Sequence, residues 1–107
     1  RVPIWPVDPL PGTGGSAVVE IYTSLAAIHA GRRAGQTKLR NYEDLNHALT
    51  TLGSAPLPAN GPVDDHISDA LLTAAWLREV SHLPEYWHPA AMTGEIAQTE
   101  GWTFGAV

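Results

Sequence analysis

The stretch from residue 64 to residue 81, DDHISDALLTAAWLREVS, constrains the fold of this chain more than any other. It opens with acidic residues and then becomes apolar on nearly every side, which is typical of a buried helix rather than a surface helix. At helical spacing, His66, Asp69 and Thr73 share one polar seam. An ionised carboxylate such as Asp69 is costly on a buried helix unless a cation, a metal or several hydrogen bonds compensate it. The sequence therefore predicts that something faces Asp69, and the best candidate elsewhere is Glu20.

The start of this helix offers two capping residues. Either Asp64 or Asp65 suits the N-cap position, where a side-chain oxygen accepts from a free backbone N–H group. Both acids also suit the positive end of the helix dipole. Asp69 lies too far inside the helix to cap it, so its presence needs another explanation.

The chain has 107 residues, which fits one domain or a part of one. Residues 1–16 contain four prolines and three glycines, and we interpret them as a Pro/Gly-rich arm with a flexible connector at GTGG. Residues 17–107 then form the core. The absence of cysteine excludes disulfides and thiol catalysis and fits a reducing compartment, so we expect a cytoplasmic protein. No apolar run approaches the roughly 18 residues that a membrane helix needs.

Residues 17–23, AVVEIYT, are the clearest predicted strand, because they are mostly β-branched or aromatic and follow a glycine-rich turn. The apolar run does not alternate, which indicates a strand covered on both faces, as in an α/β sheet. Glu20 interrupts the run, and two interpretations stay open. Its carboxylate either projects from a central strand towards a site or lies at a frayed strand end in water.

Two further helices are expected before the acidic stretch. Residues 24–30 fit a short helix that Ser24 caps and Gly31 ends. Residues 41–52 carry apolar side chains at every third or fourth position, and Gly53 terminates them. After the long helix, we expect an irregular covering loop over residues 82–94 and a last short strand or turn within residues 95–104.

The net charge of −5 argues against a surface built mainly to hold nucleic acid. Four cationic residues nevertheless lie close together in the sequence. They are Arg32, Arg33, Lys38 and Arg40. They form either a local basic patch that binds nucleic acid or a solvated turn between two elements.

Glu20 on a strand, with Asp65 and Asp69 at a helix start, forms a set of carboxylate oxygens. Such hard ligands suit Mg²⁺ or Mn²⁺ rather than Zn²⁺. Ions held there would activate water and stabilise the leaving oxygen in phosphodiester hydrolysis. His66, three residues before Asp69, suits either a ligand role or proton transfer.

Four motifs in order carry a resemblance to a known family. They are IWPVD, VVEIYTSL, DDHISDALLTAAW and EGWTFG. Over residues 5–105 the chain resembles the C-terminal half of the predicted ribonuclease-H-like nucleases of unassigned function. The resemblance implies a three-layer α/β domain of the ribonuclease H-like superfamily, with a mixed sheet flanked by helices. It also implies that Glu20 is the strand carboxylate and Asp69 the helix carboxylate of a metal-dependent nuclease, with Asp65 and His66 beside them.

The chain departs from that superfamily in two places. Nothing matches the N-terminal hairpin that carries the first catalytic Asp, and Tyr22-Thr23 stands where the family tends to have Tyr-Pro. We therefore expect an incomplete and inactive portion of a nuclease, which could form a homodimer through an exposed sheet edge. The alternative is a degenerate ribonuclease H-like domain that serves as a non-catalytic protein-interaction module.

Overall fold

The computed structural model describes residues 2–12 and 14–106. Its contacts divide the chain into two compact units. Unit 1 comprises Arg1–Tyr22 and Leu83–Val107, and unit 2 comprises Thr23–His82. The predicted arm of residues 1–16 includes Arg1 and Thr13, which lie outside the described residues.

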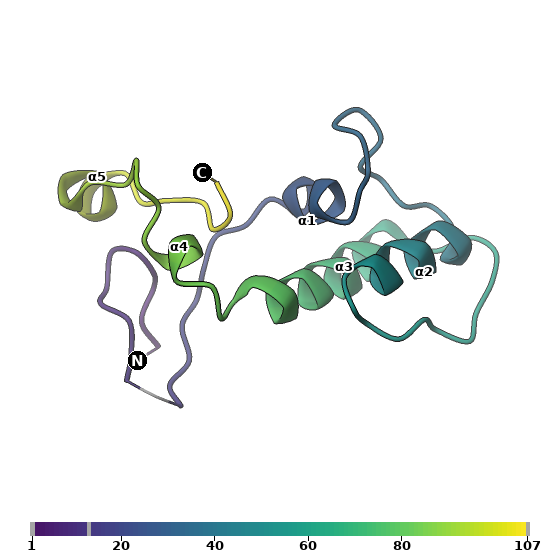
Figure 1. The fold of residues 1–107 in the computed structure, drawn as a ribbon, viewed down its shortest axis with the longest axis horizontal. Coiled ribbons are helices and arrows are strands. Elements are labelled where there is room, and N and C mark those ends of the chain that lie inside the picture. Colours follow the sequence, from purple (N-terminus) through teal and green to yellow (C-terminus); the bar gives the residue numbers. More distant parts are fainter. Residues whose placement is uncertain (1, 13, 107) are drawn as a thin grey trace. The chain divides into compact units, whose positions relative to one another are not determined.

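Unit 2 is built from three helices, of which α3 contacts both others. These are α1 (Thr23–His29), α2 (Tyr42–Thr51) and α3 (Asp65–Val80). α2 and α3 run in the same direction, and the loop between them returns along their length (Figure 1). The sequence predicted all three helices to within two residues at each end.

Local signals explain the limits of α2. The Asn41 side chain caps the helix by accepting from the Asp44 N–H at 2.7 Å, and Gly53 follows it with a φ of 80°. A positive φ strains residues that carry a Cβ atom, so glycine is the favoured residue there. Leu45 and Leu49 are buried, which confirms the predicted apolar face.

α3 is buried along one face only. Its buried residues are Ser68, Leu72, Ala75, Trp76 and Val80. Ala70 and Ala74 lie on the exposed side, where the small apolar side chain of alanine is tolerated because it favours the helical backbone. The apolar residues all round this helix therefore do not mark full burial.

Side chains of α2 fasten the long loop that precedes α3. Asn46 accepts from the Leu57 N–H at 2.7 Å and donates to the Leu57 carbonyl at 3.0 Å. The Gly61 N–H donates to Glu43 Oε1 at 3.0 Å, and this bond lowers the pKa of the Glu43 carboxyl. Hydrogen bonding to the charged form explains the direction of the shift.

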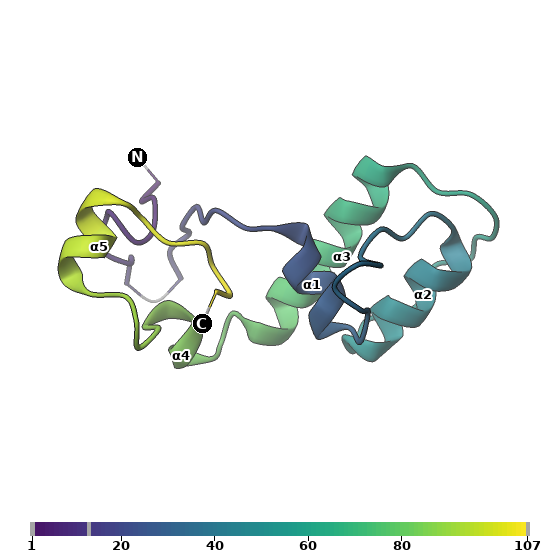
Figure 2. The same cartoon turned by 90° about the horizontal axis from the view of Figure 1, so that it is seen from above.

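Unit 1 has an aromatic core. The Trp87 and Phe104 ring centroids are 4.7 Å apart, and Trp5 meets both rings edge-on at 5.6 and 5.8 Å. Two short helices, α4 (Pro84–Trp87) and α5 (Gly94–Thr99), frame this cluster. α5 lies next to the N-terminal segment, where Gln98 Nε2 donates to the Val7 carbonyl at 2.9 Å (Figure 2).

The α/β prediction is wrong, because the described residues form no sheet. Unit 1 contains two isolated parallel bridges, Ile4 with Val18 and Glu20 with Thr103, and unit 2 contains one antiparallel bridge. Regular structure is otherwise helical, so neither a mixed sheet nor a three-layer ribonuclease H-like architecture is present in the described part.

Exposure and prolines explain why residues 17–23 do not form the expected covered strand. Val18 is 52% and Tyr22 60% exposed, which is incompatible with a strand covered on both faces. The neighbouring segment carries Pro3 and Pro6, which have no N–H group to extend a ladder. Pairing with residues 3–6 therefore stops after one bridge, at Val18, and Thr23 already belongs to α1.

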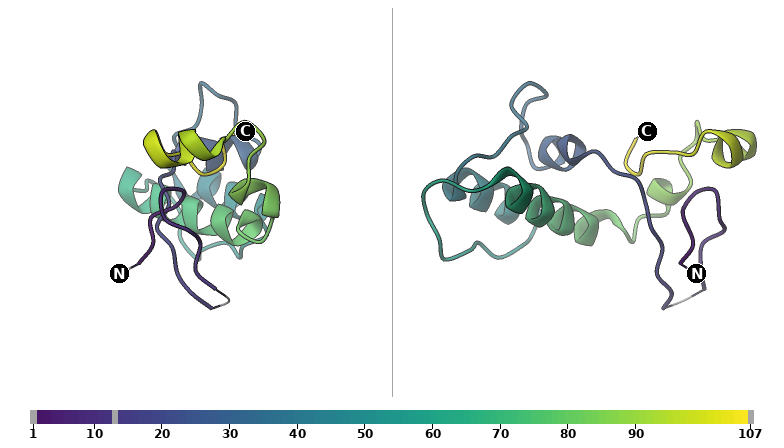
Figure 3. Two further views of the ribbon diagram at one scale, coloured as in Figure 1. Left: turned by 90° about the vertical axis from the view of Figure 1, so that its left-hand side faces the viewer. Right: turned by 180° about the vertical axis from the view of Figure 1, so that it is seen from behind.

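The connection from α1 to α2, residues 30–41, is a loop that extends away from the helices (Figure 3). It carries the four clustered cationic residues of the sequence. Among the described residues, no helix has the length and apolar character needed to cross a membrane.

Candidate functional site

Asp64 is the cap of α3. Its Oδ1 accepts from the backbone N–H of His66 at 2.8 Å and of Ile67 at 3.4 Å. This resolves the choice between two candidate caps, because Asp65 is the first helical residue. Asp65 is half-buried and does not cap the helix, so it stays a candidate ligand of the predicted metal site.

Asp69 faces a cation from the same unit. Lys38 Nζ lies 3.3 Å from Asp69 Oδ2, with the two side chains 51% and 31% exposed. The predicted need for a compensating group is therefore met by an ammonium in the α1–α2 loop, 31 residues away in sequence. No local pattern marks this pairing, because it depends on how the loop returns to α3.

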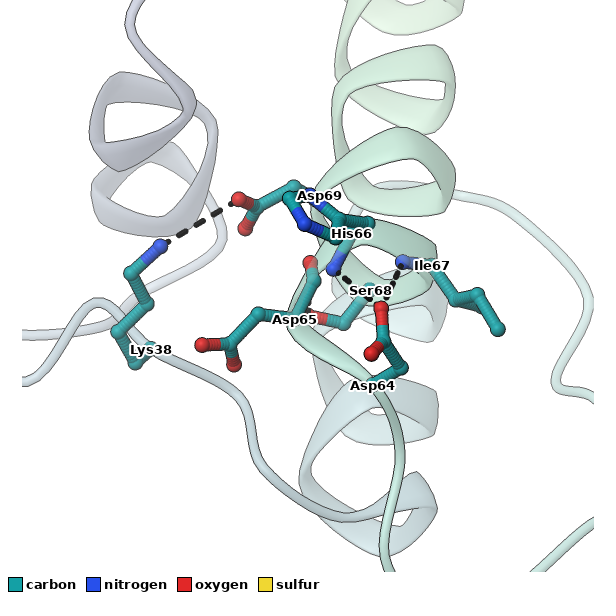
Figure 4. Close-up of polar contacts among 7 residues, drawn as sticks. All are labelled: Lys38, Asp64, Asp65, His66, Ile67, Ser68 and Asp69. Carbon is teal, nitrogen blue, oxygen red and sulfur yellow. Dashed lines mark hydrogen bonds and ion pairs between the residues drawn. The ribbon is translucent and has the colours of Figure 1, made fainter.

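Figure 4 shows the remaining members of this cluster. The Asp65 and Asp69 carboxylates point to the side of α3 on which Lys38 lies, and His66 lies beside Asp69. His66 is exposed. The three predicted α3 residues thus lie on neighbouring turns of one helix, and Lys38 pairs with one of them, Asp69.

Glu20, the fourth predicted site residue, belongs to unit 1. Its Oε1 accepts from the Thr103 hydroxyl at 3.1 Å, and its carbonyl accepts from the Phe104 N–H at 2.8 Å. The residue is exposed, in agreement with the interpretation of a carboxylate in water. Glu20 is therefore bound to residues 103–104 of the same unit.

The Lys38 ammonium bears on whether the α3 carboxylates fit a divalent ion. In the described part of the chain, no three His, Cys, Asp or Glu side chains are grouped to hold a metal. A cation bound between Asp65 and Asp69 would meet an ammonium already 3.3 Å from one of them, and like charges repel. Mg²⁺ or Mn²⁺ would therefore have to displace Lys38, and both ions stay predictions.

The four clustered cations have different environments. Lys38 pairs with Asp69, and Arg32 Nε donates to the Gln36 carbonyl at 2.9 Å within its own loop. Arg33 and Arg40 are exposed. Nucleic-acid binding through these residues stays a prediction.

Unit 1 contains a cavity of about 520 Å³ that the sequence did not indicate. Its lining combines aliphatic, aromatic and acidic side chains, including Ile4, Val7, Glu20, Ile96, Glu100 and Trp102. The Trp102 indole N–H donates to the Ala106 carbonyl at 2.9 Å, which fixes the ring in place. Nothing in the sequence around Trp102 distinguishes a residue of a cavity wall from a residue of the core.

No protein-family model, curated protein or solved structure matches the chain. The resemblance to ribonuclease-H-like nucleases thus stays a prediction, and the sheet that it implied is absent from the described residues.

Proposed function

We propose that this chain is a non-catalytic protein-binding module whose binding surface lies on unit 1. The supporting observation is the gathering of exposed apolar side chains in its N-terminal segment. Six of the eight large apolar residues that are exposed in the described chain lie there, namely Val2, Ile4, Val7, Leu10, Val18 and Tyr22. Contiguous apolar surface exposed to water marks interaction sites, so the exposed residues that lie side by side carry the proposal.

A β-bridge places two of these residues, Ile4 and Val18, side by side. Ile4 and Val18 form a parallel bridge, and they are 51% and 52% exposed. The Trp5 N–H donates to the Val18 carbonyl at 2.9 Å, so hydrogen bonds hold the pair together. A fixed apolar pair loses little conformational entropy when a partner covers it, which favours binding.

The carboxylates expected to carry catalysis support the same proposal. Asp69 is compensated by Lys38, and Glu20 accepts from Thr103. A carboxylate that already has a cationic or hydroxyl partner stabilises the folded chain without a substrate or a metal. Asp69 is therefore compensated without a metal, and Glu20 uses one of its carboxylate oxygens within unit 1.

Selection of displayed random peptides on the whole chain, followed by amide-shift mapping, tests the proposal. We expect a selected peptide to bind saturably and to shift amides of residues 2–22. The double variant Ile4→Thr with Val18→Thr keeps β-branched side chains and should weaken binding about tenfold, from the apolar area removed.

Two other exposed isoleucines provide the matched control. Ile28 and Ile67 are 45% and 49% exposed and belong to unit 2, so Ile28→Thr and Ile67→Thr should leave the peptide affinity unchanged. Equal losses in both sets of variants, or no selected peptide at all, would refute a binding surface on unit 1.

A metal-dependent nuclease is the second candidate. The observation that favours it is the common direction of the Asp65 and Asp69 carboxylates beside His66 (Figure 4). In that candidate, the two α3 carboxylates would hold Mg²⁺ or Mn²⁺ for phosphodiester hydrolysis, and a ligand role for Glu20, which belongs to unit 1, stays a prediction. It requires Lys38 to leave Asp69, which makes it the weaker of the two. A cytoplasmic location is compatible with either proposal. The homodimer expected through an exposed sheet edge loses its basis, because the described residues form no sheet.

A further inference from the structure

The cavity in unit 1 has an apolar wall and an acidic rim. Ile4, Val7 and Ile96 contribute aliphatic carbons, and Trp102 contributes an indole. Glu20 and Glu100 add two carboxylates to the same lining, and both residues are exposed. A volume of about 520 Å³ is within the range of pockets that hold small ligands and side chains.

The charge of unit 1 indicates which ligand would enter. The unit holds five carboxylate side chains, Asp8, Glu20, Glu85, Glu95 and Glu100, against one arginine, Arg1. Five negative charges and one positive charge give unit 1 a formal −4, out of −5 for the chain. An acidic surface raises the local concentration of cationic ligands and repels anionic ones.

The two cavity carboxylates retain hydrogen-bonding capacity. The ion pair found among the described residues joins Lys38 to Asp69 and includes neither Glu20 nor Glu100. Glu20 accepts one hydrogen bond through Oε1, from the Thr103 hydroxyl. An ionised carboxylate accepts about four hydrogen bonds, so each can still receive an N–H donor. Carboxylate acceptors favour charged donors over neutral ones.

The indole completes a site suited to an organic cation. Tryptophan is the aromatic residue that binds a guanidinium or an ammonium best. The N–H bond of Trp102 to the Ala106 carbonyl restricts the movement of the indole. Ile4 belongs both to the cavity wall and to the exposed apolar pair with Val18. A peptide that covers this pair would therefore have a side chain next to the cavity.

We propose that this cavity receives the side chain of an arginine or a lysine from a protein partner. This inference rests on the proposed function and specifies its ligand. Glu20 and Glu100 bind the cationic head group, while the aliphatic wall and Trp102 contact the carbon stem.

The test titrates the labelled chain with blocked Gly-Arg-Gly and with the same peptide carrying citrulline, which has the shape of arginine without its charge. The arginine peptide should give saturable shifts at Glu100, Trp102 and Thr103. It should bind at least roughly fivefold more tightly than the citrulline peptide, and less tightly as salt rises.

Matched variants test the role of the carboxylates. Glu20→Gln keeps an acceptor for Thr103, and Glu100→Gln changes an exposed side chain, so both should fold and should weaken arginine binding roughly threefold to fivefold each. Glu95→Gln removes an exposed charge from α5 outside the cavity lining and should change binding little.

Three results would overturn the inference. They are equal affinity for the citrulline peptide, shifts confined to unit 2, and an effect of Glu95→Gln as large as that of Glu100→Gln. If a selected neutral peptide still binds at Ile4 and Val18 in any of these cases, the proposed function stands and only the cationic ligand is refuted. If no peptide binds at all, both proposals fail.

Discussion

A double-mutant cycle on Lys38 and Asp69 tests whether their contact stabilises the fold. The two atoms are 3.3 Å apart, but the side chains are 51% and 31% exposed, so solvent screens the pair. Exposed pairs contribute roughly 0.2–1 kcal/mol. Asp65 lies one turn before Asp69, and like charges at this spacing oppose the helix by roughly 0.2–0.5 kcal/mol.

These opposing magnitudes predict an asymmetric cycle. Asp69→Asn loses the ion pair but relieves repulsion from Asp65, so unfolding free energy should change by less than about 0.5 kcal/mol. Lys38→Met keeps the carbon stem but leaves Asp69 uncompensated beside Asp65, and should cost up to about 1 kcal/mol. In the Asp69→Asn background, the same lysine change should have almost no effect.

Urea unfolding followed by far-UV circular dichroism measures all four proteins. The coupling energy should show that the two side chains stabilise each other by roughly 0.2–1 kcal/mol, and this stabilisation should shrink in molar salt. Additive effects of the two substitutions would refute the pairing. A stabilising Lys38→Met would do so more strongly, because it would mean that the ammonium is unfavourable beside Asp69.

Three further predictions concern unit 2. Asn46→Ala removes both hydrogen bonds to Leu57 and should lower the unfolding free energy by roughly 1–3 kcal/mol, measured as a lower urea midpoint; an unchanged midpoint would mean that the loop is not fastened there. Thr73 Oγ1 is buried and has no hydrogen-bond partner among the described residues, so Thr73→Val should raise the unfolding free energy by about 1 kcal/mol, and a loss of that size would contradict the burial. The pKa of Glu43 is lowered by the Gly61 N–H, so its stabilisation is present above the unfolded pKa near 4.5 and is lost as pH falls through the folded value. The stability of wild type relative to Glu43→Gln should therefore decrease from neutral pH to pH values well below 4.5, and a pH-independent difference would contradict the bond.

The helices of unit 2 were predictable because their signals are local. Asn41 and Asp64 cap helices through bonds to residues two or three positions ahead, and Gly53 ends α2 at a positive φ. Apolar side chains at helical spacing gave the buried face of α2. These features depend on short separations in sequence and hardly on the rest of the fold.

The sheet prediction failed for the opposite reason. A β-branched run such as residues 17–23 has no fixed partner, and whether it becomes a covered strand depends on distant segments. Here the neighbouring segments offer one bridge each, to Val18 and to Glu20. The predicted three-layer domain rested on that run and on the resemblance, and the described residues contain no sheet to support it.

The candidate site was predictable only in part. The spacing of Asp65, His66 and Asp69 on one helix follows from the sequence, and the structure has all three on α3. Lys38 was grouped with the basic residues, because its pairing with Asp69 depends on the path of a loop. The unit 1 cavity joins residues 4–7 to residues 96–106, a separation that no local pattern reports.

The most direct test of the central claim is an amide-shift titration of one labelled sample, first with Mg²⁺ and then with a selected peptide. If the chain is a binding module and Asp69 a structural ion-pair partner, millimolar Mg²⁺ should give no saturable shift centred on Asp65 and Asp69. The peptide should then shift residues 2–22. Saturable Mg²⁺ shifts at both aspartates that disappear in Asp69→Asn, without any peptide response, would contradict the account and favour the metal-dependent nuclease.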